Sequence, residues 1–241
     1  MKRIFFLFIC FQIVNFTFAV EPKYAHWSAT IDLGTNFFDG DIKDIHTSFL
    51  DKLSHPSLGA SIDYAISPFV SLGFAYNYHY VQADDGTDYF TNNTQQFYPY
   101  LSLDLLNLAF QKNPGNFGLW AQVGFGLASY KFTNQTKPEI YYDPYYNGSA
   151  HYYYLSNPSK LYNSYIIPYG FTLEYKISNQ LSLGLQIDRY KYSKDNLEGI
   201  TQFNWWGVTN DFVTSVMLQM RYKFCPKDKK HMRDCSWSEV F

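Results

Sequence analysis

Histidine and serine are the residues of this sequence that could support hydrolytic chemistry. His79 lies in an alternating segment beside Asn77 and tyrosines. Other histidines fall at strand starts or in loops: His26, His46, His55 and His151. A nucleophile needs a base and an orienting group within hydrogen-bond reach. The spacing pairs no histidine with a serine on the outer face of one strand, so the sequence predicts no catalytic residue and no cofactor.

Cysteine chemistry is confined to the C-terminal segment once the apolar leader that holds Cys10 is set aside. Cys225 and Cys235 then remain, ten residues apart. In an oxidising compartment this spacing favours a small disulfide loop. Metal binding together with His231 is the alternative, but a fourth ligand is missing, and no metal site is predicted. The loop encloses basic residues that could meet anionic lipid or a partner protein: Lys227, Lys229, Lys230 and Arg233.

Charged side chains recur on one parity of the alternating segments. They are Asp32, Asp63, Asp104, Glu174, Lys176, Arg221 and Lys223. If this parity faces the inside of a small barrel, the charges must pair, because an unpaired ion in a poorly hydrated interior costs several kcal/mol. We predict a structural charge network that plugs the polar lumen, in which Arg221 pairs with one or more of Asp63, Asp104 and Glu174. A narrow, gated polar path through the lumen is the alternative interpretation.

The elements that would position these side chains are eight alternating segments. They span residues 27–38, 58–67, 69–80, 97–106, 117–128, 165–177, 181–190 and 211–224. Successive strand residues point to opposite faces, so each segment has one apolar face and one small or polar face. The links after the first, third, fifth and seventh segments are long, and those between are short or moderate. This asymmetry predicts an all-β, eight-stranded antiparallel up-and-down barrel that spans a membrane.

Composition bears on which face of the strands meets lipid. Charged residues make up 17% of the chain and aromatic residues 21%, against roughly 25% charged in soluble proteins. We therefore expect Val70, Leu72 and Phe74 to face lipid, with Tyr76, Tyr78 and Tyr80 in the outer aromatic girdle. A soluble lipocalin-like barrel is the alternative. The net charge of −2 gives no reason to expect a nucleic-acid partner.

The N-terminal residues read as an export signal. Lys2 and Arg3 precede an apolar run, and Ala19 ends a stretch of residues suited to cleavage. We predict a signal peptide at residues 1–19, an outer-membrane barrel at 20–224 and a periplasmic tail at 225–241. The expected location is the outer membrane of a Gram-negative bacterium.

Four stretches together carry a family resemblance: "TIDLGTNFFDGD", "HPSLGASIDYAISPFVSLGFAYNYHY", "YGFTLEYKISNQLSLGLQ" and "MLQMRYKF". The chain resembles the N-terminal barrel of OmpA-like outer-membrane proteins in the style of Bacteroidota. Many members continue through an acidic, calcium-binding-type linker into a peptidoglycan-binding domain. Here the basic "CPKDKKHMRDC" stands where that linker would begin. We therefore expect neither calcium binding there nor a peptidoglycan-binding domain.

The third long loop is rich in tyrosine, asparagine, serine and glycine. Tyr145, Tyr146, Tyr152 and Tyr153 are candidate surface-loop contacts, because tyrosine offers a large rigid area with a polar tip. An ordered cap above the membrane is the alternative. The stretch "DDGTD", residues 84 to 88, offers carboxylates for calcium but lacks the full spaced loop.

These observations lead to one expected function and two alternatives. We expect a non-enzymatic outer-membrane barrel that acts as a structural or interaction component of the cell envelope. Its partners would be outer-membrane lipid or lipopolysaccharide and another envelope protein, bound through the tail or the surface loops. A lipid-modifying outer-membrane enzyme and a small gated pore are the alternatives.

Overall fold

The computed structural model describes the alternating segments of the chain and their shorter links. It covers residues 26–39, 55–67, 69–84, 89–110, 116–134, 153–155, 160–178, 180–194, 197, 200–202 and 211–224. The predicted signal peptide and periplasmic tail, with Cys225 and Cys235, lie outside the described residues. So do three of the predicted loop contacts, Tyr145, Tyr146 and Tyr152.

Strands dominate the described chain. In order, the elements are β1 (His26–Asp39), β2 (Pro56–Ser67), β3 (Val70–Asp84), β4 (Tyr89–Asp104), α3 (Leu105–Ala109), β5 (Phe117–Gly124), β6 (Gly126–Asn134), β7 (Tyr153–Leu155), β8 (Tyr162–Lys176), β9 (Leu181–Tyr192), β10 (Ile200–Gln202) and β11 (Phe212–Phe224). Among the described residues, no helix is long and apolar enough to cross a membrane.

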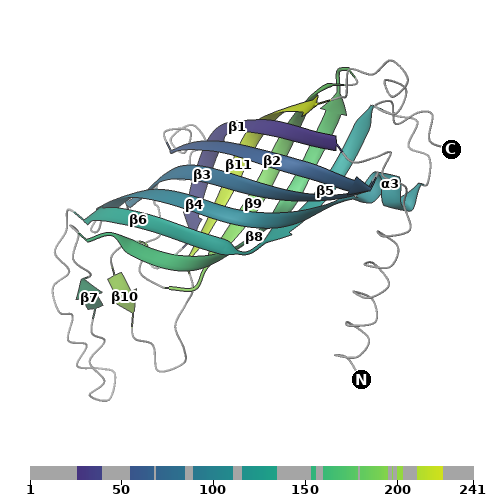
Figure 1. Ribbon diagram of the computed structural model, residues 1–241. Helices are drawn as coiled ribbons and strands as arrows, with labels where there is room; N and C mark the ends of the chain where they lie inside the picture. The colour runs from purple at the N-terminus through teal and green to yellow at the C-terminus, as the bar shows by residue number, and fades with distance from the viewer. Residues whose placement is uncertain are drawn as a thin grey trace, which may run out of the picture.

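The long strands close into an antiparallel barrel. β1 to β4 pair in sequence order and β8 pairs with β9. β11 pairs with both β9 and β1, so that Trp27 lies opposite Phe224. β5 and β6 share one position in the wall, because both pair with β4 on one side and with β8 on the other. Figure 1 shows the strands wound around a common interior, with α3 at one end and the small β7–β10 sheet beyond the other. The predicted eight-stranded barrel is confirmed.

The fifth and the fourth predicted segments are interrupted or cut short in the structure. The fifth is divided at Phe125, whose backbone N–H donates to Pro99 O (3.3 Å), so the wall is kinked there and continues as β6. The fourth was expected to reach residue 106, which is wrong. It ends at Asp104, because the chain turns there into α3.

The link after the third segment is shorter than predicted. β3 and β4 remain paired as far as Asp84 and Tyr89, so residues 85–88 alone connect them. Polar residues such as Gln82 and Asn93 continue the inward and outward alternation beyond the apolar residues of these strands. The two strands therefore stay extended and paired there. Most of the "DDGTD" stretch falls outside the described residues.

The outer wall carries a continuous apolar band. Leu72 and Phe74 are 50% and 53% exposed, as the predicted parity requires. On β8 the exposed apolar residues run from Tyr165 to Tyr175, roughly 33 Å along the strand. At a strand tilt near 40° this corresponds to about 25 Å of height, the apolar band of an outer-membrane barrel. Val70 is the exception to the predicted lipid-facing set, because it is buried beside the register shift at the β2–β3 turn.

Aromatic residues mark the end of the wall at which the short turns lie. Trp27 packs on Tyr64 with ring centroids 4.9 Å apart, and Tyr222 packs on Phe224 at 5.4 Å. Phe117 and Tyr175 form a third pair at 5.1 Å. Since aromatic girdles sit at the membrane surface, this end of the apolar band lies at headgroup level.

The barrel interior has two chemically different halves. Most of the buried charged side chains lie in the half near the short turns, whereas buried aromatic and aliphatic residues, with Asp211 beside them, fill the half near the long loops. The latter include Val81, Phe90, Tyr130, Ile166, Tyr192, Leu197 and Val213. The sequence prediction of a polar lumen did not distinguish these halves.

Candidate functional site

The charged half of the lumen is centred on Arg221. Its Nη1 donates to Glu174 Oε2 (2.8 Å) and its Nε to Thr30 Oγ1 (3.4 Å). Its guanidinium also lies 5.4 Å from the ring centroid of Trp120. Glu174 belongs to β8 and Arg221 to β11, so the ion pair passes over β9, the strand between them. Both partners are buried, with Arg221 8% and Glu174 1% exposed.

Asp63 is held by a tyrosine rather than by a direct ion pair. The hydroxyl of Tyr100 donates to Asp63 Oδ1. The ring of Tyr100 lies against Gly73, where an added Cβ would meet Tyr100 Cζ at 2.3 Å. The glycine is therefore what lets a large inward tyrosine reach the carboxylate.

Asp104, one of the predicted lumen charges, is buried and also caps a helix. It is the N-cap of α3, where its Oδ1 accepts from Leu106 N (3.0 Å) and Asn107 N (3.1 Å). Its Oδ2 accepts from Asn107 Nδ2 (2.8 Å). A side-chain oxygen at this position satisfies the free N–H groups of a helix start. The structure therefore brings Arg221 to Glu174 and places Asp104 at the end of the barrel.

Replacing Asp104 with Ala is expected to lower the free energy of unfolding by about 0.5–2 kcal/mol, the usual cost of a lost N-cap. The barrel should still assemble, because the strand pairing is untouched. Urea titration of the refolded protein in lipid vesicles measures the change. Asp104→Asn is the matched control, since Asn is also a good cap, and it should lose less; equal losses would contradict a capping role.

The remaining predicted charges lie in the same half of the lumen. Asp32 and Lys223 are buried and Lys176 is half-buried. Glu174 and Asp104 are the acidic neighbours of Lys176. Asp63 and Asp32 are the other carboxylates near Arg221.

Amide and tyrosine side chains bridge the barrel higher in the lumen. Asn77 Nδ2 on β3 donates to Tyr98 OH (2.7 Å) and to Tyr190 OH (2.8 Å) on β9. Gln96 Nε2 on β4 donates to Tyr192 OH on β9 (2.6 Å). β9 is not a neighbour of β3 or β4 in the wall. The bonds from Asn77 to Tyr190 and from Gln96 to Tyr192 therefore cross the interior.

A serine–histidine pair in this region was not predicted from the sequence. Ser57 Oγ bonds His79 Nδ1, and His79 Nε2 lies 3.2 Å from Gln96 Oε1. The two residues are partners in the β2–β3 register, which the spacing alone does not reveal. Neither has exposed surface, so the pair does not face lipid. The second ring nitrogen of His79 contacts the Gln96 amide, whereas a catalytic triad has a carboxylate at that position.

The remaining predictions concern metal ligands and surface-loop contacts. Within the described ranges, no three His, Cys, Asp or Glu residues are placed to hold a metal ion. Tyr153 begins β7, which pairs with β10 so that two loops meet above the barrel.

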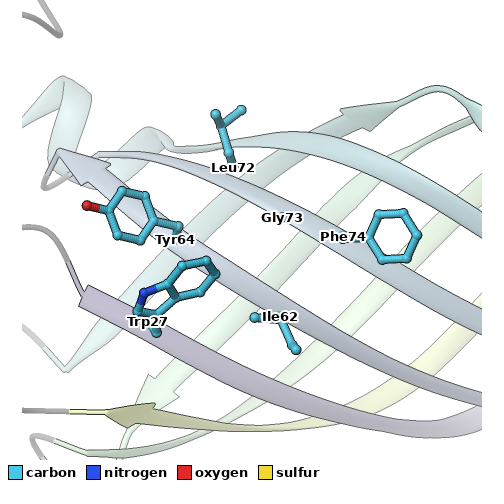
Figure 2. A pocket seen from close by; sticks show the side chains of 6 residues that line it. All are labelled: Trp27, Ile62, Tyr64, Leu72, Gly73 and Phe74. Atoms are coloured by element: carbon cyan, nitrogen blue, oxygen red, sulfur yellow. The ribbon is translucent and has the colours of Figure 1, made fainter.

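The outer wall is hollowed near the headgroup-level aromatic residues. It has a volume of about 460 Å³, is open, and is lined by Trp27, Ile62, Tyr64, Leu72, Gly73 and Phe74. Figure 2 shows these side chains rising from β1, β2 and β3 on the outer surface. The lining is apolar and continuous with the band, so the hollow belongs to the surface that meets lipid.

Comparisons with known proteins gave likenesses to solved structures alone. No protein-family model and no curated protein matches the chain. Ail, the attachment invasion locus protein of Yersinia pestis, has 10% identity, a TM-score of 0.47 and coverage of 83% of this chain and 99% of that one. Neisserial surface protein A has 10% identity, a TM-score of 0.49 and coverage of 82% and 97%. The outer membrane enzyme PagL has 11% identity, a TM-score of 0.38 and coverage of 81% and 98%.

These likenesses carry no argument about activity, because the identities are low and all three TM-scores lie below 0.5. The fold assignment rests on the closed strand pairing and the exposed apolar band. By these two features, the chain is a membrane-spanning β-barrel of the outer-membrane type.

Proposed function

We propose that the chain is a non-enzymatic structural or interaction component of the cell envelope, anchored in the outer membrane of a Gram-negative bacterium. The apolar outer band supports the membrane location, because only a closed barrel or a helix satisfies its backbone in lipid. The resemblance to OmpA-like barrels in the Bacteroidota style is part of this proposal.

The observation that carries the proposal is the filled lumen. Side chains from opposite walls meet through the Arg221–Glu174 ion pair and the Asn77–Tyr190 hydrogen bond. An eight-stranded barrel is just wide enough for its own side chains. A barrel of this kind acts through its outer surface and its loops.

We expect the purified protein to give no steady ion currents in planar bilayers. The two layers of cross-lumen contacts, one ionic and one aromatic, leave no continuous water path on this proposal. Single-channel recording at moderate salt is the measurement. Steady wild-type currents that change when Arg221 is replaced would favour the small gated pore instead.

A lipid-modifying enzyme is the competing class. The Ser57–His79 pair does not support it, because both side chains are buried inside the barrel. Lipid A mass spectra from wild-type and deletion strains separate the two proposals. A deletion-specific loss of an acyl change would favour the enzyme.

The loops and the tail are the proposed contact regions for lipopolysaccharide and for another envelope protein. This part of the proposal rests on sequence: the tyrosine-rich loop, and the basic tail that a Cys225–Cys235 disulfide would close. Crosslinked envelopes from strains with the full chain, and with a chain ending at Phe224, give the test. Identical partner sets would show that the tail has no binding role.

A further inference from the structure

Basic side chains are spread unevenly around the outside of the barrel. Within their described ranges, the strands β1 to β4 contain no lysine or arginine. At the long-loop end of β6, β8 and β9, by contrast, five basic side chains are exposed or half-buried. They are Lys131, Lys160, Arg189, Lys191 and Lys194. Since β6 pairs with β8 and β8 with β9, these residues form one basic strip on this side of the wall.

On β9 the basic strip begins where the apolar band ends. Leu183, Leu185 and Ile187 are exposed on the outer face, and Arg189 and Lys191 follow them on the same parity. Two residues advance roughly 7 Å along a strand, so the charges lie just beyond the apolar zone. The long loops of outer-membrane barrels are on the cell surface. The strip therefore lies at the headgroup level of the outer leaflet.

Two of the lysines are held close to the barrel wall. The backbone N–H of Lys194, just after β9, donates to Ser164 Oγ on β8 (3.2 Å). Lys160 Nζ lies 5.8 Å from the ring centroid of Tyr162 at the start of β8. The other basic residues of the strip belong to β6 and β9 themselves. The barrel therefore sets the positions of these charges.

Carboxylates neutralise little of the strip within the described chain. Asp39 Oδ2 lies 2.9 Å from Arg189 Nη2, and the Arg189 guanidinium also lies 4.4 Å from the ring centroid of Phe212. The other outward carboxylate described at this end is Asp84, on β3, which pairs with none of β6, β8 and β9. No ion pair among the described residues involves the lysines of the strip. The strip therefore keeps a net positive charge.

We propose that the basic strip binds the phosphate groups of a phosphorylated glycolipid of the outer leaflet, with the acyl chains of that lipid against Leu185 and Ile187. The inference rests on the proposed outer-membrane location, and it adds the barrel wall to the loops and the tail as a place that binds lipopolysaccharide. Cationic side chains at a membrane surface attract anionic headgroups, and arginine can give two donors to one phosphate. Because the strip continues into the lipid-facing band, a lipid fits this surface better than a soluble protein does.

Native mass spectrometry of the full-length protein in detergent tests the phosphate contact. The protein is titrated with diphosphoryl lipid A and, separately, with the same lipid after enzymatic removal of both phosphates. Each cation near an anionic headgroup contributes about fivefold in affinity, so two contacts give a roughly 10- to 30-fold preference for the phosphorylated lipid. Equal affinity for the two lipids would overturn the proposal.

Paired variants locate the contact on the wall. R189Q/K191Q removes the two charges nearest the apolar band and should abolish most of the preference for the phosphorylated lipid. K229Q/K230Q is the matched control, because it removes two charges from the tail and should keep the preference. D39N releases Arg189 from its carboxylate, so it should bind diphosphoryl lipid A at least as tightly as the wild type does.

Heat-modifiable mobility on gels separates failure of the strip from failure of the proposed function. R189Q/K191Q should fold into phosphatidylcholine vesicles as the wild type does, because both side chains lie outside the lumen. If the folded variant keeps the full preference, or if K229Q/K230Q loses it, the strip is not the site, although the outer-membrane location stands. If the wild type does not fold into vesicles, the membrane location and the strip are both wrong.

Discussion

Replacing Arg221 with Met is expected to lower the free energy of unfolding by about 3–5 kcal/mol. Met occupies a similar volume but carries no charge, so Glu174 would remain buried with its Oε2 unpaired. The cost arises from the stranded carboxylate more than from the lost attraction. Urea titration in lipid vesicles measures it, and heat-modified mobility on gels across a temperature series gives an independent reading.

Two variants show whether the stranded charge is the cause. The double variant R221M/E174Q removes both charges and should recover much of the loss. R189M is the surface control, because Arg189 Nη2 lies 2.9 Å from Asp39 Oδ2 in an exposed ion pair, close to the 2.8 Å of the lumen pair. Its loss should cost about 1 kcal/mol or less. Equal losses for R221M and R189M would mean that the lumen pair contributes little.

Gly73→Ala is expected to cost about 1–3 kcal/mol through overpacking. The added methyl group would lie 2.6 Å from the Tyr100 hydroxyl oxygen. The ring must move, and the hydrogen bond to Asp63 is then lost. The same urea titration provides the measurement.

Gly118→Ala is the matched control for this substitution. Gly118 is buried and Gly73 half-buried, but an added Cβ at Gly118 meets its nearest atom, Trp120 Nε1, at 3.1 Å. A small shift of the indole relieves this contact, so the variant should be close to wild type. In a Tyr100→Ala background the penalty of G73A should disappear; an unchanged penalty would contradict the explanation.

Strand alternation was sufficient to predict the closed barrel and most of its inward and outward residues. Leu72 and Phe74 face outward and Glu174 and Arg221 face inward, because a period of two places side chains on a sheet regardless of detailed packing. Val70 did not follow the pattern, since the register shifts at the turn that precedes it.

The roles of individual polar residues depended on information that alternation does not carry. Asp104 could be assigned to a helix cap only once the chain was seen to turn after β4. Ser57 and His79 meet because the β2–β3 register sets them opposite each other.

The seam between β1 and β11 also bears on how the barrel forms. The hydrogen bond from Arg221 to Thr30 joins residues 191 apart in sequence, and contacts of such long range slow folding because loop closure must come first. Until β11 is in place, the backbone N–H and C=O groups along one edge of β1 and one edge of β9 have no strand partner. Such an edge promotes aggregation in water and leaves these groups without hydrogen bonds in lipid. Insertion into the bilayer and closure of the seam are therefore coupled, and an assembly factor that shields the β1 edge would act until the last strand arrives.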